Sequence, residues 1–348
     1  MKKIIGGCIL LMLLPIVAVS QEKRLQGMWY NMENLFGEGE LTEMKWTPKK
    51  YAKKLQKMGQ LLLMINEWQE TGLIGLCEIG GANVMEDLLH EISLKEKGYR
   101  YSMTEGADVR GIQVALLYKV PMFTKMGEAS YRIDMEDKRP TRDILHVWGQ
   151  VCTGDTLDVL LCHFPSRSGE AREVEWRQHR AGRRLREVCD SLQAIRGEKN
   201  KVLVMGDFNE GKELHVLRNE VGATSWKKDV APTDKGKLYE LPYSGGSYKY
   251  RGVWSTFDKI LVNGGLLDSG GSVYLKAESV KRMDEEFLLK KDKTWGGVRP
   301  WRTHYGYRYE GGFSDHLPLL FELQLNCSPD EADERQRRPA TFRFPEGL

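Results

Sequence analysis

Two short polar motifs lie beside apolar segments and carry residue types that catalyse hydrolysis. The segment 206–209 (Gly-Asp-Phe-Asn) follows an apolar stretch at 201–205, and the segment 314–316 (Ser-Asp-His) precedes another at 317–323. Because a strand can hold a polar group rigidly, we expect each motif to lie at the end of a strand. Acid, amide and imidazole groups held in this way indicate a metal-assisted attack of water on a phosphate ester.

Four further segments place polar side chains beside strand-like stretches, and each is weak evidence alone. Asp and Asn favour turns, a Glu at a strand end is commonly a surface residue, and a lone His is commonly structural. Together, the six segments supply carboxylates, amides and two histidines. The catalytic candidates are His163, Asp207, Asn209, Asp258 and His316, and the cation-ligand candidates are Asn31, Glu33, Glu78 and Asp315.

The chemistry of this set favours a hard divalent cation together with proton transfer. Carboxylates and amides without thiolates are suited to Mg²⁺ or Mn²⁺. Each histidine has a carboxylate in the set that could orient it for proton transfer near neutral pH.

Taken in order along the chain, the six segments resemble the endonuclease/exonuclease/phosphatase superfamily, the deoxyribonuclease I-like enzymes. The resemblance extends over about residues 25–325, and its most specific motifs are 206–209 and 314–316. The sequences at 31–36 and 309–316 are similar to those of secreted bacterial members. The resemblance implies an α/β fold, a four-layer α/β/β/α sandwich of two mixed sheets packed face to face, with the site at one end.

The resemblance also implies the metal ligands. Glu78 would be the principal ligand, helped by Asn31, Glu33 or Asp315. Mg²⁺, or Mn²⁺ in its place, would be the cofactor.

The remaining catalytic candidates receive their roles from the same resemblance. Asp207 and Asn209 would orient the attacking water and the scissile phosphate. His316 would accept a proton or contact the phosphate, paired with Asp258 or with the acid that precedes it. His163 would stabilise the phosphorane oxygens or protonate the leaving group. Which histidine is the base and which is the acid stays open.

Two arginines are candidates for phosphate binding. A family arginine precedes the strand expected at 144–151, and Arg142 fits that position better than Arg139. Arg167, four residues after His163, is the second candidate. The alternative for each is an exposed surface arginine. The arginines and aromatics at 299–305 could hold a base, a sugar or a lipid head group, but packing within the loop is favoured.

Apolar periodicity predicts the elements that must position these groups. Three- and four-residue steps predict helices over 48–70, 84–97 and 170–195. Short apolar stretches predict strands over 25–30, 73–77, 112–118, 144–151, 157–162, 202–205, 259–262 and 318–323. Many strands with few helices between them favour two packed sheets with helices outside. The segments 212–252 and 282–312 are expected to be long loops around a substrate pocket.

Residues 1–20 have the pattern of a cleaved secretory signal. Lys2 and Lys3 precede an apolar stretch at 4–19, which ends in a small-x-small site. An uncleaved anchor is the alternative, and no later segment is apolar and long enough to span a membrane. We therefore expect a secreted or periplasmic protein without stable membrane insertion, with one catalytic domain over 21–326. The polar residues 327–348 are expected to form a disordered tail.

Cysteine usage points away from a thiolate metal site. The five cysteines after residue 20 are Cys77, Cys152, Cys162, Cys189 and Cys327, without any CxxC spacing. Cys77, Cys152 and Cys162 lie in apolar stretches and are expected to be small buried hydrophobes. At most two disulfides are possible, and the pairing stays open.

Three functions are compatible with these features. The first is a secreted, metal-dependent phosphoesterase acting as a monomer on a phosphodiester or phosphomonoester. The second is a DNA or RNA endonuclease of the same fold, which the seven arginines between 167 and 186 favour. The formal net charge of +3, or +1 without residues 1–20, weakens it, because phosphate backbones are held by several cations. The third is a non-catalytic binding protein, which would lack one or more site residues.

Overall fold

The computed structural model describes residues 21–37, 46–68, 70–91, 94–136, 139–167, 169–210, 215–228, 230, 232 and 234–327. The expected signal segment at 1–20 and residues 328–348 of the expected tail lie outside the described residues. None of the helices in the described ranges is long and apolar enough to cross a membrane.

Two seven-stranded sheets account for most of the strands in the described residues. The first contains β14 (Val273–Leu275), β20 (Leu319–Cys327), β1 (Gln21–Leu35), β2 (Thr71–Ile79), β4 (Gln113–Lys119) and β3 (Tyr99–Met103) in this order, with β15 (Lys281–Arg282) on β20. The second contains β5 (Phe123–Tyr131), β6 (Ile144–Val151), β7 (Thr156–His163), β8 (Val202–Asp207), β13 (Asp258–Asn263), β10 (Leu238–Leu241) and β9 (Thr224–Ser225). Both sheets are mixed, because β1 and β2 are parallel, as are β7 and β8, among antiparallel neighbours.

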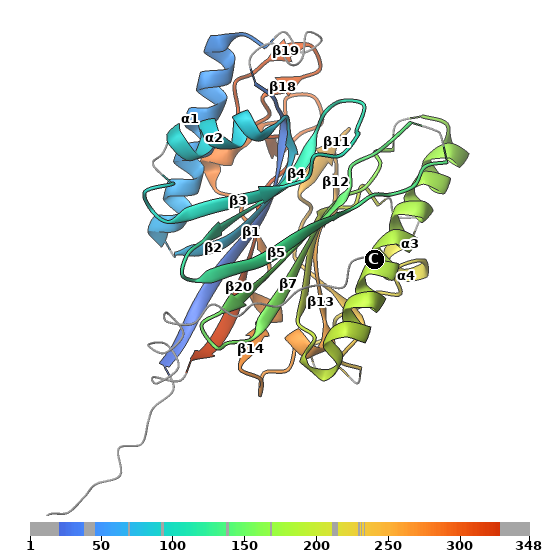
Figure 1. Ribbon diagram of the computed structural model, residues 1–348. Coiled ribbons are helices and arrows are strands. Elements are labelled where there is room, and N and C mark those ends of the chain that lie inside the picture. The colour runs from blue at the N-terminus through green and yellow to red at the C-terminus, as the bar shows by residue number, and fades with distance from the viewer. Residues whose placement is uncertain are drawn as a thin grey trace, which may run out of the picture.

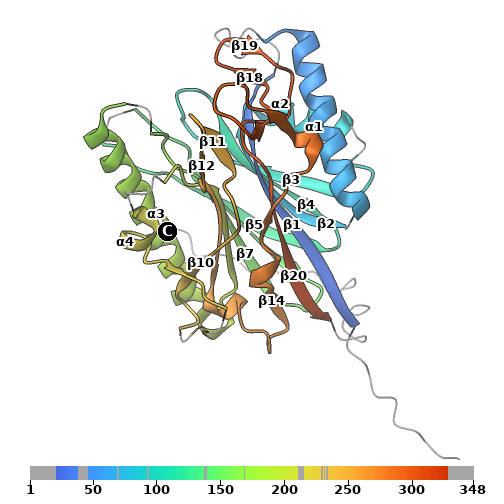
Figure 2. The same ribbon diagram turned by 180° about the vertical axis from the view of Figure 1, so that it is seen from behind.

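Helices cover the outer face of each sheet (Figure 1, Figure 2). Helices α1 (Pro48–Trp68) and α2 (Ala82–Glu91) lie on the first sheet, whereas α3 (Ala171–Arg196) and α4 (Val216–Asn219) lie on the second. This arrangement confirms the predicted four-layer sandwich. The predicted helices agree closely with α1 and α3, but α2 ends at Glu91 rather than near residue 97.

Strand β1 shows how the sequence builds these layers. Successive side chains of a strand point to opposite faces. Leu25 and Trp29 accordingly enter the core between the two sheets, whereas Met28 and Tyr30 enter the core beneath the helices. Gly27 points inward, where a Cβ would lie 2.0 Å from the Phe321 ring. The inter-sheet core therefore needs glycine at this position.

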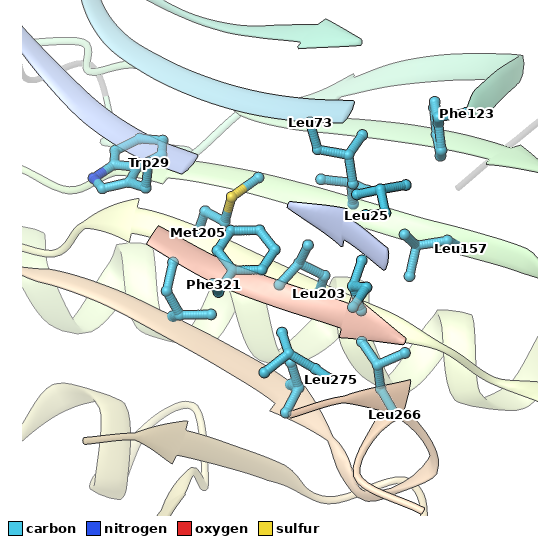
Figure 3. Close-up of a cluster of buried hydrophobic side chains, with 14 of the residues drawn as sticks. Leu25, Trp29, Leu73, Phe123, Leu157, Leu203, Met205, Leu266, Leu275 and Phe321 are labelled. Carbon is cyan, nitrogen blue, oxygen red and sulfur yellow. The ribbon is translucent and has the colours of Figure 1, made fainter. Parts of the chain in front are cut away.

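The core between the sheets is built from strands that are buried on both faces. Leu203, Met205, Phe321 and their neighbours interdigitate there (Figure 3). Every residue of β8 is buried, which explains why its sequence is a continuous apolar stretch rather than an alternating one.

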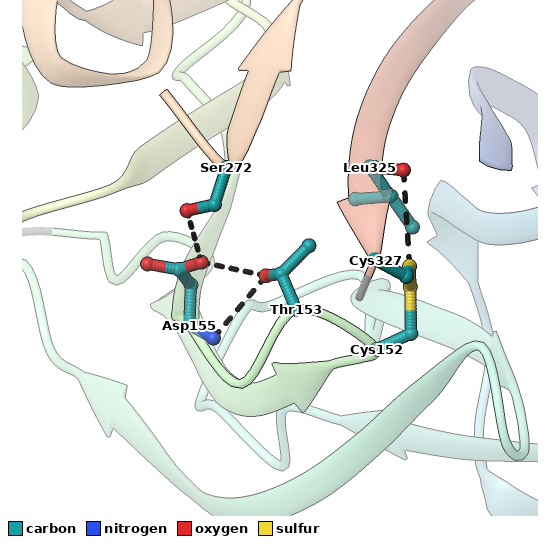
Figure 4. Close-up of a disulfide and its surroundings, with 6 residues drawn as sticks. All are labelled: Cys152, Thr153, Asp155, Ser272, Leu325 and Cys327. Atoms are coloured by element: carbon teal, nitrogen blue, oxygen red, sulfur yellow. Dashed lines mark hydrogen bonds between the residues drawn. A yellow bond between two sulfur atoms is a disulfide. The ribbon is translucent and has the colours of Figure 1, made fainter. Parts of the chain in front are cut away.

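One disulfide joins the two sheets. Cys152, which follows β6 in the second sheet, pairs with Cys327 at the end of β20 in the first (Figure 4). The expectation that Cys152 is a small buried hydrophobe was therefore wrong, because its apolar surroundings also accommodate a partner sulfur. Cys77 and Cys162 are free and buried, as predicted.

The two predicted long loops contain short elements. The first carries α4, β9, β10 and a hairpin of β11 (Tyr248–Tyr250) and β12 (Val253–Ser255). The second carries the hairpins β16–β17 (Leu289–Lys291, Val298–Pro300) and β18–β19 (His304–Tyr305, Arg308–Tyr309). Strands of two or three residues are too short to leave a period in the sequence.

Candidate active site

Three neighbouring strands of the second sheet carry three of the predicted catalytic residues at the same end of the sheet: β7 and β8 end in them, and the antiparallel β13 begins with one. The register places His163 of β7 opposite Asp207 of β8, and Asp207 opposite Asp258 of β13. All three side chains are buried. Because the sheet fixes their backbones, the three groups form a rigid row across one end of the sandwich.

The first sheet contributes Asn31 from β1 and Glu78 from β2. The pairing of β1 with β2 shifts register after Asn31, and Glu33, Asn34 and Glu78 have positive φ values of 47°, 50° and 60°. Such bulges re-aim side chains and are common beside active sites. The Asn34 N–H donates to Glu78 Oε2 at 2.8 Å, and this bond holds the Glu78 carboxylate in place.

The 314–316 segment, just before β20, is fastened to β1 of the first sheet and to β11 of the β11–β12 hairpin. Ser314 Oγ donates to the Asn31 carbonyl at 2.7 Å and accepts the His316 N–H at 3.1 Å. Tyr248 pairs with His316 as an isolated bridge, and their rings lie 4.8 Å apart. These contacts place the His316 ring over the row formed by β7, β8 and β13.

Asp258 orients His316 and is itself held by the first sheet. His316 Nδ1 lies 2.6 Å from Asp258 Oδ2, and Trp29 Nε1 donates to Asp258 Oδ1 at 2.7 Å. His316 Nε2 then faces Asp207 Oδ2 at 3.7 Å. Burial opposes the charge on His316, but Asp258 and Asp207 outweigh it and raise the pKa of His316 to about 10. At neutral pH the ring is an imidazolium with a proton on each nitrogen, of which only the one on Nδ1 is hydrogen-bonded, to Asp258.

Asp207 is held by two donors on its two oxygens. Asn31 Nδ2 donates to Oδ2 and the Asn209 N–H donates to Oδ1, both at 3.0 Å. Burial is the main cause that raises the pKa of Asp207 to about 7, with Asp258 and Glu78 adding to it against the opposing charge of His316. A carboxylate with a pKa in this range can accept a proton near neutral pH.

His163 lies on the opposite side of Asp207 from Asp258. Its Nε2 is 3.7 Å from Glu78 Oε1 and 3.8 Å from Asp207 Oδ2, while its buried Nδ1 has no hydrogen-bond partner in the described structure. Burial and the nearby Arg142 hold the pKa of His163 well below its usual value. The two histidines therefore differ in charge at neutral pH, with His163 neutral and His316 cationic.

The donor set beside this row fits a hard divalent cation. Asp207, Asp258 and His316 offer ligand atoms within 4.8 Å of one another, but hydrogen bonds already occupy both Asp258 oxygens and His316 Nδ1. Glu78 and the half-buried Asp315 are better suited, because the Asp315 carboxylate forms no hydrogen bond or ion pair with a described residue. Oxygen donors with surplus negative charge and no thiolate are the set that Mg²⁺ prefers.

Glu33 has partners that differ from those expected. Its two oxygens accept the Thr303 N–H at 2.6 Å and the His304 N–H at 2.8 Å. The buried Lys54 donates to Thr303 Oγ1 at 2.5 Å, and the negative charges of Glu33 and Asp315 support the charge on Lys54 against its burial. Glu33 thus fastens the 303–304 segment beside the site, and its oxygens are directed to that backbone.

The two candidate arginines differ sharply in their surroundings. Arg142 is buried: its Nε donates to the His163 carbonyl at 3.0 Å, one terminal nitrogen donates to the Phe164 carbonyl, and the other lies 3.2 Å from Asp108 Oδ2. Arg167 is exposed on the loop after β7. Only Arg142 is built into the site.

Sequence reasoning missed Trp29, Lys54 and Asp108. Trp29 could have been found, because alternation along a strand places it on the same face as Asn31. Lys54 lies within an amphipathic helix and Asp108 within a connection, and neither carries a local signal of its distant partners.

The 299–305 segment packs as favoured. Arg299 pairs with Glu310 at 2.8 Å, and Trp301 lies edge-on to the Phe313 ring. Arg302 lies over the Tyr248 ring, 5.3 Å from its centroid. The segment therefore supports the ring that contacts His316.

Comparisons with known proteins agree with this architecture. A sequence model described as the Endonuclease/Exonuclease/phosphatase family matches residues 28–325. The endonuclease/exonuclease/phosphatase of Bacteroides vulgatus is 14% identical, with 87% of this chain and 99% of that chain covered at a TM-score of 0.55. No curated protein matches the sequence.

Two further solved structures have the same fold. A humanized TDP2 of D. rerio is 13% identical, with 86% of this chain and 98% of that chain covered at a TM-score of 0.55. The mannosyl-6-phosphatase of Bacteroides thetaiotaomicron is 17% identical, with coverages of 86% and 99% and a TM-score of 0.51. At these identities the likeness concerns the fold, and the chemistry must be argued from the site.

Proposed function

The chain belongs to the endonuclease/exonuclease/phosphatase family, whose members are hydrolases of phosphoester bonds, and we propose that it is a secreted, metal-dependent phosphoesterase. The observation that carries this proposal is the convergence of Asp207, Asp258 and His316 with Glu78 and His163 at one end of the two sheets. Asp207, Asp258 and His316 are buried and hydrogen-bonded, and the two histidines differ in charge, which suits the hydrolysis of a phosphate ester.

Divalent metal dependence is typical of the family, and we assign the ion to Mg²⁺ or Mn²⁺. Glu78 would be its principal ligand, with Asp315 and Asn31 beside it. When bound, the ion supplies a Lewis acid that neutralises charge on the phosphate. Glu33 is left out of this set, because backbone amides hold both of its oxygens.

Water attacks phosphorus while the ester P–O bond breaks, so water loses one proton and the leaving oxygen gains one. Asp207 accepts the proton of the attacking water, which its raised pKa permits. Asn209, whose N–H holds Asp207 Oδ1, positions the water and the phosphate. Asp207 then returns its proton to solvent, and solvent protonates the leaving oxygen, so one water is consumed for each ester hydrolysed.

The two histidines contact different oxygens of the substrate. The His316 imidazolium, fixed through Nδ1 by Asp258, directs its Nε2–H at the phosphate oxygens and offsets their growing charge. The neutral His163 lies on the other side of Asp207 and hydrogen-bonds the leaving oxygen. Arg142 positions His163 through its backbone carbonyl.

We also propose that the protein is exported and acts as a monomer on a phosphate ester. The signal-like sequence at 1–20 supports export. The disulfide between Cys152 and Cys327 adds to it, because such bonds persist in oxidising compartments.

A hydrolysis panel tests the proposed function. The purified chain from residue 21 onward is incubated with bis-p-nitrophenyl phosphate, several phosphomonoesters, plasmid DNA and RNA, in Mg²⁺, in Mn²⁺ or in chelator. We expect hydrolysis of at least one ester that chelator abolishes and Asp207→Ala removes. If the folded protein hydrolyses none of them, the result favours the alternative that the chain is a non-catalytic binding protein with this fold.

A further inference from the structure

A small pocket lies beside the active site and is dominated by arginines. It has a volume of about 140 Å³ and is lined by Asp108, Arg110, Arg139, Arg142, Ser166 and Arg177. Pockets that enclose a whole small molecule measure roughly 300–1,000 Å³. This one therefore has room for a single chemical group rather than for a complete ligand. We call it the arginine pocket.

Positive charge in the arginine pocket exceeds negative charge. Asp108 is its one acid, and the nearest atoms of Arg142 and Arg110 lie 3.2 Å and 3.9 Å from its carboxylate. Arg139 and Arg177 form no ion pair with an acid in the described residues. Four cations facing one carboxylate repel one another unless an anion joins them.

Some hydrogen-bond donors of the arginine pocket are also left without a good acceptor. One terminal nitrogen of Arg177 donates a long hydrogen bond of 3.4 Å to the Arg139 carbonyl. The buried Nε of Arg177 has no hydrogen-bond partner in the described structure. Buried polar groups are normally satisfied. Guanidinium groups are the donors that match phosphate oxygens in pairs. The pocket is therefore equipped for a tetrahedral oxyanion.

Arg142 connects the arginine pocket to the catalytic row. Its guanidinium lines the pocket while its Nε and one terminal nitrogen hold the carbonyls of His163 and Phe164. His163 then reaches toward Asp207 and Glu78 through Nε2. Ser166, three residues further along the same segment, lines the pocket. One short segment thus separates the two places where an anion can be held.

We propose that the arginine pocket binds a second phosphate of the substrate while the first is hydrolysed. This rests on the proposed phosphoesterase function and narrows the substrate class to molecules with more than one phosphate. The second group would be either the neighbouring diester of a nucleic acid strand or a phosphomonoester of a small, multiply phosphorylated molecule. The two sources share the phosphate oxygens but differ in charge.

Isothermal titration calorimetry of the purified chain in chelator tests the pocket without catalysis. Inorganic phosphate represents the monoester and dimethyl phosphate represents the diester. We expect wild type to bind at least one of them, and Arg110→Gln/Arg139→Gln to weaken this binding about tenfold or more. Arg172→Gln, which removes an exposed arginine of the same helix as Arg177 outside the pocket, is the matched control and should bind like wild type. Binding of dimethyl phosphate favours a nucleic acid strand, and binding of phosphate alone favours the small molecule.

Two outcomes overturn the proposal: wild type binds neither probe, or the double variant binds as wild type does. Circular dichroism confirms that each variant is folded. A second readout is the ratio of kcat/KM for a dinucleotide with a terminal phosphate to that for the same dinucleotide without it. This ratio should fall in the double variant and stay constant in Arg172→Gln. If phosphate binding depends on the arginines but wild type hydrolyses no ester, the arginine pocket is a phosphate-binding site and the proposed phosphoesterase function is wrong.

Discussion

Trp29 and Asp258 belong to different sheets and are joined by a hydrogen bond of 2.7 Å from the indole Nε1–H to Oδ1. The other oxygen of Asp258 holds His316. The indole of the first sheet therefore sets the position of a carboxylate in the second, and this carboxylate sets the imidazolium.

Trp29→Phe removes this donor while retaining most of the ring packing. We expect the free energy of unfolding to fall by about 1–3 kcal/mol, because Asp258 loses a buried partner. We also expect kcat to fall about tenfold, because Asp258 orients His316 less well. Urea denaturation and initial rates measure the two effects. Trp226→Phe, a partly buried tryptophan of the same core, is the control. Equal kcat values for the two variants would contradict the orienting role.

Glu78→Gln tests the metal assignment. The amide keeps the size of the side chain but lacks its charge, so we expect weaker Mn²⁺ binding and loss of most metal-dependent turnover. Electron paramagnetic resonance of added Mn²⁺ measures the binding directly. Glu96→Gln, an exposed substitution beyond α2, should change neither quantity. Near-normal activity of Glu78→Gln in Mg²⁺ would show that the principal ligand lies elsewhere.

Asp158 controls the stability of the second sheet at acidic pH. Burial opposes its ionisation, but hydrogen bonds from His146 and Arg196, each 2.9 Å at the nearest atoms, outweigh burial and hold the pKa of Asp158 below its usual value. Asp158→Asn should lower the free energy of unfolding by about 3–5 kcal/mol at neutral pH, because Arg196, whose side chain is only 10% exposed, loses the carboxylate that balances its charge.

The difference in the free energy of unfolding between wild type and Asp158→Asn should become smaller as the pH falls. A carboxylate with a depressed pKa stabilises the fold above its unfolded pKa of about 3.9 and loses this contribution as pH falls through the lower folded value. The difference is therefore largest above about pH 4 and shrinks below it. Urea denaturation from pH 7 to pH 3 measures it, with the exposed substitution Asp134→Asn as the control. A difference that grows toward low pH would contradict the assignment.

The disulfide between Cys152 and Cys327 closes a loop of 175 residues. Cross-links of long loops restrict the unfolded chain, so replacing both cysteines by serine should cost about 2–5 kcal/mol of unfolding free energy. Denaturation with and without reductant tests this. Reductant should lower the stability of wild type to that of the double variant and leave the variant unchanged. A wild type that does not respond to reductant would show that the bond contributes nothing.

The sequence predicted the positions of the candidate catalytic residues better than it predicted their partners. Asp207, Asp258 and His163 lie directly beside strands, so their positions followed from local patterns. The choice of Asp258 rather than Asp315 as the partner of His316 depends on the pairing of β8 with β13, which no local pattern contains.

The partners of Glu33 and of Cys152 could not be predicted from local patterns, and for the same reason. Glu33 accepts from backbone amides at Thr303 and His304, and any residue could supply such amides. Cys152 has its partner 175 residues away, and spacing carries no information on that proximity. The edge strand β5 was missed because its partly exposed side chains, many of them polar, leave no apolar stretch.

The antiparallel pairing of β1 with β20 places the first and the last of the described residues side by side. Asn31 leaves the ribosome almost three hundred residues before His316. The two segments are joined by the hydrogen bond from Ser314 Oγ to the Asn31 carbonyl. Contacts of such long sequence separation form late in folding. The candidate site therefore cannot assemble until the segment that carries His316 has been synthesised, and a chain that is shorter than this should be inactive inside the cell.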